Sequence, residues 1–325
     1  MQPPSVSPSL PSLPSPRASF HKLLAALDAV PLENAVVGVV VRDSEEAVSV
    51  DVRNHAISID ARAVEPMLRF AKRALRESRH NEEPEQQQEE ATQLEFTAEQ
   101  VSRVLLLLVG DYGAAWNARR RRLAELSHED ALALEWAYTA VVIRRFPKSS
   151  EAWWHLWYIT VRLFASSRHP IPKVAPDKNI VARARALCER ICEQSPSNYY
   201  AWTFRTRLLV LELEACDGMD SVRECVRREL EYADRWLWMH VSQSCVYHFR
   251  RALIELQIKH CWSAAESVNQ GVRLVRAEMA LAERVQQRYP RAAPQCIETH
   301  TVALQRRLSL LLDDDTTVEP VPALN

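Results

Sequence analysis

Seven cysteines are the first candidates for metal binding or nucleophilic chemistry in this 325-residue chain. Cys188 and Cys192 lie four residues apart, a spacing that places two thiols on one face of a helix. A structural zinc site needs four ligands, usually a C-x-x-C pair with further cysteines or histidines at fixed spacing, and the sequence shows no such set. We therefore predict free thiols in a reducing compartment and no metal site in this chain.

Acidic and histidine side chains offer two further possibilities. Residues 313–315 are three consecutive aspartates that could bind magnesium, but they follow the last predicted helix, where a charge run is usually a solvated tail. His155, His240 and His248 lie in or beside aromatic segments, where histidine more often packs or forms hydrogen bonds than catalyses a reaction. The sequence also has no glycine-rich phosphate loop and no H-E-x-x-H motif, so these residue types predict no catalytic residue.

A large aromatic residue followed three positions later by an arginine recurs along the chain. Trp116 precedes Arg119, Trp202 precedes Arg205 and Tyr247 precedes Arg250; a fourth segment has Trp153 but Leu156 at the arginine position. The segments are GDYGAAWNARRRRL (110–123), PKSSEAWWHLWYIT (147–160), PSNYYAWTFRTRLL (196–209) and VSQSCVYHFRRALI (241–254). Each begins with polar residues or proline and then has one or two small residues, so the sequence predicts four related helix starts.

This spacing has a physical meaning. An aromatic side chain in the first turns of a helix buries a large area against a neighbouring helix. An arginine three positions later lies on the same face, and its guanidinium can pair with a neighbour's carboxylate or reach a partner protein. Two alternatives therefore stay open for the tryptophans and arginines: they hold adjacent repeats together, or they contribute to a binding surface.

Helices are the elements that must position these segments. Five glycines in the whole chain and 47% hydrophobic residues favour helices over a strand-rich fold, which needs many tight turns. The aromatic residues are separated by 37, 49 and 45 residues, with another predicted helix in each interval. This period is typical of helical hairpins, and the predicted fold class is all-α, an α-α superhelix with a small N-terminal strand-containing element. The expected repeat helices span 97–109, 113–125, 128–146, 149–166, 177–194, 197–214, 219–233, 236–260, 262–288 and 294–311.

Changes in composition along the chain predict its domain boundaries. Residues 1–19 are rich in proline and serine and are expected to be disordered, and 20–76 form a small α+β region. In that region we expect helices at 20–30 and 64–76 and strands within 35–43 and 47–60. Residues 77–95 are an acidic polar linker, 96–312 form the superhelix, and 313–325 are a flexible tail.

Charge and hydropathy narrow the class of protein. A formal net charge of -1 gives no basic field for nucleic acid, and no nucleic-acid partner is expected. The apolar runs are too short to span a membrane, and the first residues lack the apolar region of a signal peptide. A cytoplasmic protein is therefore predicted.

The third segment resembles the repeat of protein prenyltransferase α subunits, P-x-N-Y-x-x-W-x-x-R-x-x-L-L, at nearly every position. DYGAAWNARRRRL resembles the family's first repeat, and FPKSSEAWWHLWYI resembles its proline–lysine–serine variant. HVSQSCVYHFRRALIE (240–255) is similar to one branch of the family, the prenyltransferase α subunit repeat-containing proteins. The resemblance covers residues 96–260.

The resemblance implies an α-type subunit of a heterodimeric protein prenyltransferase, which transfers geranylgeranyl to protein cysteines together with a β subunit. In the family the β subunit binds the zinc, so no cofactor is expected in this chain and the chain alone is expected to be inactive. The expected partners are a β subunit, of the Rab geranylgeranyltransferase type, and prenyl-acceptor proteins. The alternative is a helical-repeat adaptor that binds proteins and takes no part in prenyl transfer.

Ten residues carry the repeat signature and are the candidates for partner binding: Trp116, Arg119, Trp153, Asn198, Tyr199, Trp202, Arg205, Tyr247, His248 and Arg250. The family suggests that Tyr199 lines the mouth of the lipid or diphosphate site, and it is the one candidate for a catalytic role. The alternative for Tyr199 is a ring packed between hairpins. Farnesyl and type-I geranylgeranyl α subunits have a lysine before the Asn-Tyr pair of a central repeat, where this chain has Ser197.

Overall fold

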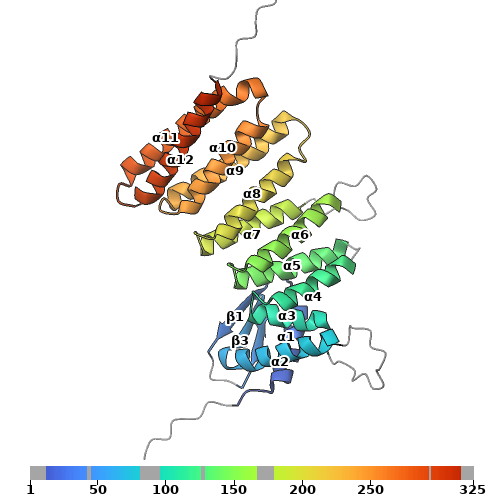
Figure 1. Ribbon diagram of the computed structural model, residues 1–325. Helices are drawn as coiled ribbons and strands as arrows, with labels where there is room; N and C mark the ends of the chain where they lie inside the picture. The colour runs from blue at the N-terminus through green and yellow to red at the C-terminus, as the bar shows by residue number, and fades with distance from the viewer. Residues whose placement is uncertain are drawn as a thin grey trace, which may run out of the picture. The chain divides into compact units, whose positions relative to one another are not determined.

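The computed structural model describes residues 12–41, 45–80, 96–125, 129–166, 179–292 and 294–315. Twelve helices and three strands lie in these residues (Figure 1). They confirm the predicted fold class, all-α with a small strand element near the N-terminus. The chain divides into two compact units, Met1–Ile180 (unit 1) and Val181–Asn325 (unit 2). Most of the predicted disordered start, acidic linker and tail, and the proline-rich loop predicted at 167–177, lie outside the described residues.

Unit 1 contains the sheet. β1 (Val36–Val40), β2 (Val48–Asp51) and β3 (Ala56–Asp60) lie in the order β1-β3-β2, with β3 parallel to β1 and antiparallel to β2. The carboxylate of Asp51 accepts hydrogen bonds from the backbone N–H groups of Arg53 and Asn54, both at 3.1 Å, and so holds the turn between β2 and β3. Alternating valines and isoleucines predicted strands in this region, and the three strands confirm that prediction.

Two helices pack beside this sheet. α1 (Pro16–Ala29) begins four residues before the predicted helix, because the Ser15 hydroxyl accepts a hydrogen bond from the N–H of Ala18 and proline suits the first helical position. α2 (Ala61–His80) follows β3 directly. The ring of Phe20 on α1 lies 5.4 Å from Phe70 on α2 and 4.6 Å from Phe96, which joins these elements into one apolar cluster.

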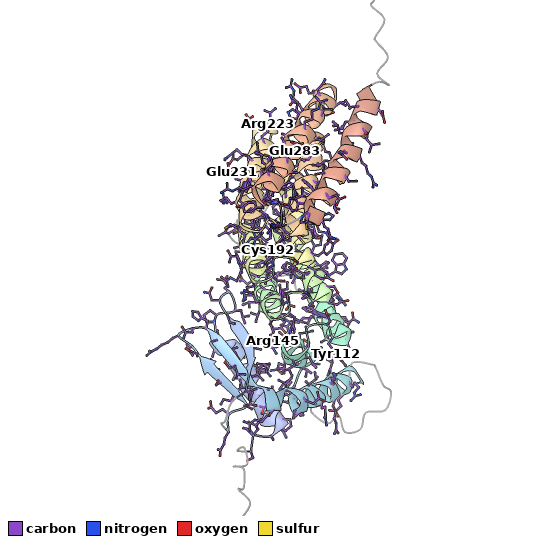
Figure 2. The ribbon with its side chains drawn as sticks, turned by 90° about the vertical axis from the view of Figure 1, so that its left-hand side faces the viewer. Tyr112, Arg145, Cys192, Arg223, Glu231 and Glu283 are labelled. Atoms are coloured by element: carbon purple, nitrogen blue, oxygen red, sulfur yellow. The ribbon has the colours of Figure 1, made fainter. Side chains whose placement is uncertain are left out.

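The remaining helices of unit 1 are α3 (Ala98–Leu108), α4 (Gly113–Glu125), α5 (Glu129–Arg145) and α6 (Ser150–Ser166). α5 ends beside the sheet with two arginines. Arg144 donates to the carbonyl of Leu32 at 2.6 Å, and Arg145, labelled in Figure 2, donates to that of Val37 at 3.3 Å. These bonds connect the first helical hairpins to the strand region within unit 1.

Unit 2 consists of helices: α7 (Ile180–Gln194), α8 (Tyr199–Leu213), α9 (Met219–Met239), α10 (Ser244–His260), α11 (Ala264–Arg288) and α12 (Pro294–Asp315). α9 packs against α10 and α11 against α12 (Figure 1). The predicted break between helices at 234–235 is wrong. α9 continues to Met239 because Trp236 and Leu237 extend its buried face, and the chain turns at His240 instead.

Candidate partner-binding face

The four aromatic residues of the signature share one contact. Each side chain donates a hydrogen bond to the backbone carbonyl six residues earlier. These bonds join Trp116 to Gly110 (2.8 Å), Trp153 to Pro147 (2.9 Å), Trp202 to Pro196 (3.2 Å) and Tyr247 to Val241 (2.8 Å). All four rings are buried. The fixed distance between the helix start and the aromatic residue therefore has a cause: the side chain closes the turn that leads into its own helix.

The three signature arginines are buried as well and bind carboxylates of neighbouring helices. Arg119 is bidentate to Glu135, with its Nε 2.6 Å from Oε1. Arg250 is bidentate to Glu278, with both hydrogen bonds at 2.7 Å. Bidentate arginine–carboxylate pairs fix both partners geometrically, so these pairs set the packing of one helix against the next.

Arg205 in the third repeat is the most enclosed of the three, with 2% of its surface exposed. Its Nε donates to Glu229 at 2.6 Å, its Nη1 donates to Glu189 at 3.0 Å, and its guanidinium lies 3.6 Å above the ring of Tyr232. Glu229 also accepts a hydrogen bond from Arg185 at 2.8 Å. This geometry favours the alternative in which the signature arginine holds adjacent helices together.

The second repeat, which lacks the arginine, uses a histidine instead. Leu156 is fully buried at the arginine position, and its neighbour His155 places Nε2 2.8 Å from Glu135. The His155 ring also packs 4.9 Å from Trp116 of the first repeat. Glu135 therefore receives hydrogen bonds from the first and second repeats together.

Helix α12 repeats this arrangement in unit 2. His300 places Nε2 3.0 Å from Glu278, and its ring lies 5.0 Å from Tyr247. Glu278 thus binds an arginine and a histidine, as Glu135 does. The last helix therefore contributes a fifth position to the pattern, although its sequence has no aromatic–arginine pair to reveal it.

The electrostatics follow from these contacts. Burial by itself raises the pKa of Glu135, but Arg119 and His155 together hold it at about 2. Burial also raises the pKa of Glu278, but His300 and Arg250 together lower it to about 2. A carboxyl group whose folded pKa lies below its ordinary value of 4.5 stabilises the fold above that value. This stabilisation is lost as the pH falls toward 2.

We expect the substitution Glu278→Gln to reduce the dependence of the unfolding free energy on pH in acid. Wild type and variant should differ most in unfolding free energy above pH 4.5, and the difference should shrink between pH 4.5 and 2 as Glu278 becomes protonated in the wild type. Urea unfolding at a series of pH values measures this. Glu298→Gln, at an exposed site on the neighbouring helix α12, is the control and should follow the wild-type curve. A constant difference at all pH values would contradict the assignment.

Three signature residues remain. Asn198 is buried and caps α8, with its Oδ1 accepting a hydrogen bond from the N–H of Ala201 at 3.0 Å. Tyr199, the one candidate for a catalytic role, is 67% exposed, so its ring is not packed between hairpins. His248 is exposed on α10. Eight of the ten signature residues are thus buried, and Tyr199 and His248 are the two that a partner can reach.

A second set of side chains lies on the opposite side of the signature helices. Positions one and five after each aromatic residue point away from the buried anchors. We call these positions the signature face: Asn117, Arg121, Trp154 and Tyr158 in unit 1, and Thr203, Arg207, His248 and Ala252 in unit 2. Within unit 1 α4 lies beside α6, and within unit 2 α10 lies beside α8 and α12. Neighbouring helices therefore present these positions side by side in each unit.

The unit 1 part of the signature face is aromatic. Trp154 is 61% exposed and Tyr158 is 48% exposed, one helical turn apart on α6. They line a cavity of about 310 Å³ together with Arg120 and Glu151, whose side chains form a 2.8 Å ion pair between α4 and α6. Exposed tryptophan and tyrosine beside charged residues are typical of protein–protein interfaces. This cluster is the strongest candidate for partner contact in unit 1.

Metal ligands do not gather in the part of the chain that the structure describes: no group of three His, Cys, Asp or Glu side chains is placed to hold an ion. Cys188 and Cys192 lie on α7, where Cys192 is labelled in Figure 2, and both are buried. Burial raises the pKa of the Cys192 thiol to about 12. Among the described residues, no helix is both long and apolar enough to cross a membrane.

A comparison with protein families identifies the class of repeat. Residues 181–211 match the protein prenyltransferase alpha subunit repeat. This match covers most of α7 and α8, including Asn198, Trp202 and Arg205. The resemblance predicted from the third segment is confirmed by this match.

Individual proteins are also similar to this chain. The chain is 31% identical over 178 residues to protein prenyltransferase alpha subunit repeat-containing protein 1 of Danio rerio, covering 51% of this chain and 39% of the relative. It is 26% identical over 166 residues to the Homo sapiens protein of that name, covering 48% and 39%. Geranylgeranyl transferase type-2 subunit alpha of Mus musculus is 25% identical over 175 residues, covering 52% and 27%. The chain therefore matches less than half the length of each of these relatives.

Proposed function

We propose that this chain is the α-type, non-zinc-binding subunit of a heterodimeric protein prenyltransferase that transfers geranylgeranyl to protein cysteines. The observation that carries the proposal is the repeat at 181–211. In two further repeats, an aromatic residue and an arginine form the same kind of buried contacts as they do in this repeat. The similarity to a mouse protein named as a geranylgeranyl transferase α subunit supports geranylgeranyl as the transferred lipid.

The proposed reaction divides its chemistry between two chains. A cysteine thiolate of the acceptor protein attacks the first carbon of the prenyl diphosphate, and diphosphate leaves. Zinc in the β subunit would lower the pKa of the acceptor thiol. In this chain Arg119, Arg205 and Arg250 are enclosed in ion pairs with carboxylates, so they shape the scaffold and do not meet the diphosphate.

The contribution of this chain is then to bind the β subunit and complete the rim of its site. Trp154 and Tyr158 would enter the interface, because their exposed rings supply a large apolar area at little cost in conformational entropy. Tyr199 is the candidate for contact with lipid or diphosphate at the rim, because its hydroxyl-bearing ring is exposed at the start of α8. We propose a β subunit of the Rab geranylgeranyltransferase type as the partner and the cytoplasm as the location.

Affinity purification of the tagged full-length chain from its own cells, followed by mass spectrometry, tests the proposal. A prenyltransferase β subunit should be recovered in near-equal amount with the chain. Recovery of other proteins without any β subunit would overturn the proposal and favour the adaptor alternative.

We expect the double substitution Trp154→Ala and Tyr158→Ala to weaken binding to the β subunit by at least about 2 kcal/mol, roughly thirtyfold in Kd. The melting temperature should barely change, because both rings are largely exposed. Trp238→Ala is a matched control: this tryptophan is 36% exposed on α9, outside the signature face. Biolayer interferometry with the purified β subunit measures the effect. Equal affinities for wild type and the double variant would exclude the aromatic cluster from the interface.

A further inference from the structure

An open cavity of about 410 Å³ lies between α10 and α12 of unit 2. Its floor is apolar: Ile254, Val275 and Leu304 line it, are at most 4% exposed and belong to one buried apolar cluster. Leu310 adds an apolar wall that is 58% exposed. The volume lies within the usual range for small-ligand sites, roughly 300–1,000 Å³. An apolar chain of a ligand would therefore fit against this floor.

The rim of the cavity is cationic. Arg251, Arg306 and Arg307 line it, with Glu255 as the one acidic lining residue. Glu255 is already paired, since it accepts a 2.7 Å hydrogen bond from Arg307. In the described part of the chain, neither Arg251 nor Arg306 has a carboxylate within ion-pair distance. Neither guanidinium group is thus in a direct ion pair at the rim, although Glu278 attracts Arg251 from beyond the His300 ring.

Arg251 is held in an unusual way. Its Nη1 donates to Nδ1 of His300 and its Nη2 donates to Nδ1 of His248, both at 2.8 Å. Each imidazole accepts at that nitrogen, and His300 places its other nitrogen, Nε2, 3.0 Å from Glu278. The two rings therefore fix the direction of the guanidinium without neutralising its charge. A half-buried arginine fixed in this way is preorganised to bind an anion.

The space around Arg251 can accept a headgroup. Arg251 and His248 also line a second cavity of about 140 Å³, which includes Ser244 and Thr299. Hydroxyl groups, an imidazole and a guanidinium are the usual partners of phosphate oxygens. A phosphate monoester carries a charge of about -1.5 to -2 at neutral pH, which matches the two unneutralised arginines better than a carboxylate does.

We propose that this cavity binds an amphipathic phosphate: a phosphate monoester headgroup on Arg251 and Arg306, with an apolar chain against Ile254 and Leu304. The site lies between α10 and α12 and shares His248 and Ala252 with the signature face, but its ligand binding does not depend on the proposed role in prenyl transfer. It would give this chain a ligand of its own.

Isothermal titration of the full-length chain with decyl phosphate, below the concentration at which it forms micelles, tests the site. One saturable site is expected, with an affinity at least about tenfold higher than for inorganic phosphate, decanoate or decanol. Arg306→Gln and Arg251→Gln should each weaken decyl phosphate binding about tenfold or more. Arg306 is exposed, so its variant should keep the wild-type melting temperature. Arg223→Gln, at an exposed site on α9, is the matched control and should bind as the wild type does.

Three results would overturn the proposal. The first is the absence of saturable binding of decyl phosphate to the wild-type chain. The second is equal affinity for inorganic phosphate, which would show a general anion effect without the apolar cavity. The third is wild-type affinity in the Arg306→Gln variant, because its folded state is not in question.

Discussion

Replacing Glu229 with glutamine is expected to lower the free energy of unfolding of unit 2 by about 3–5 kcal/mol. Glu229 is 1% exposed on α9 and accepts hydrogen bonds from Arg205 at 2.6 Å and Arg185 at 2.8 Å. Glutamine keeps the volume of the side chain but removes the charge, so two arginines would lose their shared counter-charge. Arg205 would keep Glu189 and Arg185 would keep Glu212, but Glu189 is 40% exposed, and a buried ion-pair network that loses one of its charges is strongly destabilised.

Glu224→Gln is the control for this prediction, because Glu224 lies on the same helix but is exposed and paired with exposed Arg227. Exposed ion pairs contribute little to stability, so its unfolding curve should overlay that of the wild type. Chemical denaturation followed by circular dichroism measures both variants. Similar small effects for Glu229 and Glu224 would show that the buried pairs do not hold the helices together.

The substitution Trp202→Ala is expected to have an effect of the same size, about 3–5 kcal/mol. The Trp202 ring packs 4.9 Å from Trp236 and 5.2 Å from Phe249, and its Nε1 donates to the carbonyl of Pro196. Truncation would leave a large cavity and an unpaired carbonyl at the start of α8. Because small domains are stable by only about 5–15 kcal/mol, such a loss leaves unit 2 close to unfolding.

Trp154→Ala gives the comparison that separates the two roles of tryptophan in the repeats. Trp154 is 61% exposed, so its loss should leave the melting temperature nearly unchanged while it weakens partner binding. Differential scanning fluorimetry of the two variants is sufficient. If Trp154→Ala destabilised the fold as strongly as Trp202→Ala, the distinction between buried anchors and an exposed signature face would fail.

The sequence was sufficient to predict the helices because their start signals are local. Pro196 precedes α8 and Asn198 caps its start, and the aromatic residue then lies at a fixed distance from that start. The small strand element was also predictable from the alternation of valine and isoleucine. The end of α9 could not be predicted in this way. The segment around Trp236 has no proline or glycine to mark a helix end, and its burial in the structure shows that it continues the helix.

The partners of the signature arginines could not be predicted with the same ease. Glu135, Glu229 and Glu278 follow their arginines by 16, 24 and 28 residues, since the loops between helices differ in length. One regular signal was present and was missed: an acidic residue 16 positions before the arginine, which is Glu189 for Arg205 and Asp234 for Arg250.

The exposed residues of the signature face were also difficult to predict from the sequence. Trp153 and Trp154 look equivalent in the sequence, yet the first is 4% exposed and the second 61%. The hydrogen bond from Trp153 to the carbonyl of Pro147 marks Trp153 as the anchor. The sequence could thus predict which segments matter, while the structure was needed to assign each side chain to the core or to the signature face.

Native mass spectrometry can test whether this chain acts as the α-type subunit of a prenyltransferase. The full-length chain is co-expressed with each protein prenyltransferase β subunit of its own organism, and the mass of the purified complex is measured. We expect a one-to-one complex with one of these subunits that also retains a zinc ion. Detection of the free chain alone with every β subunit would contradict it.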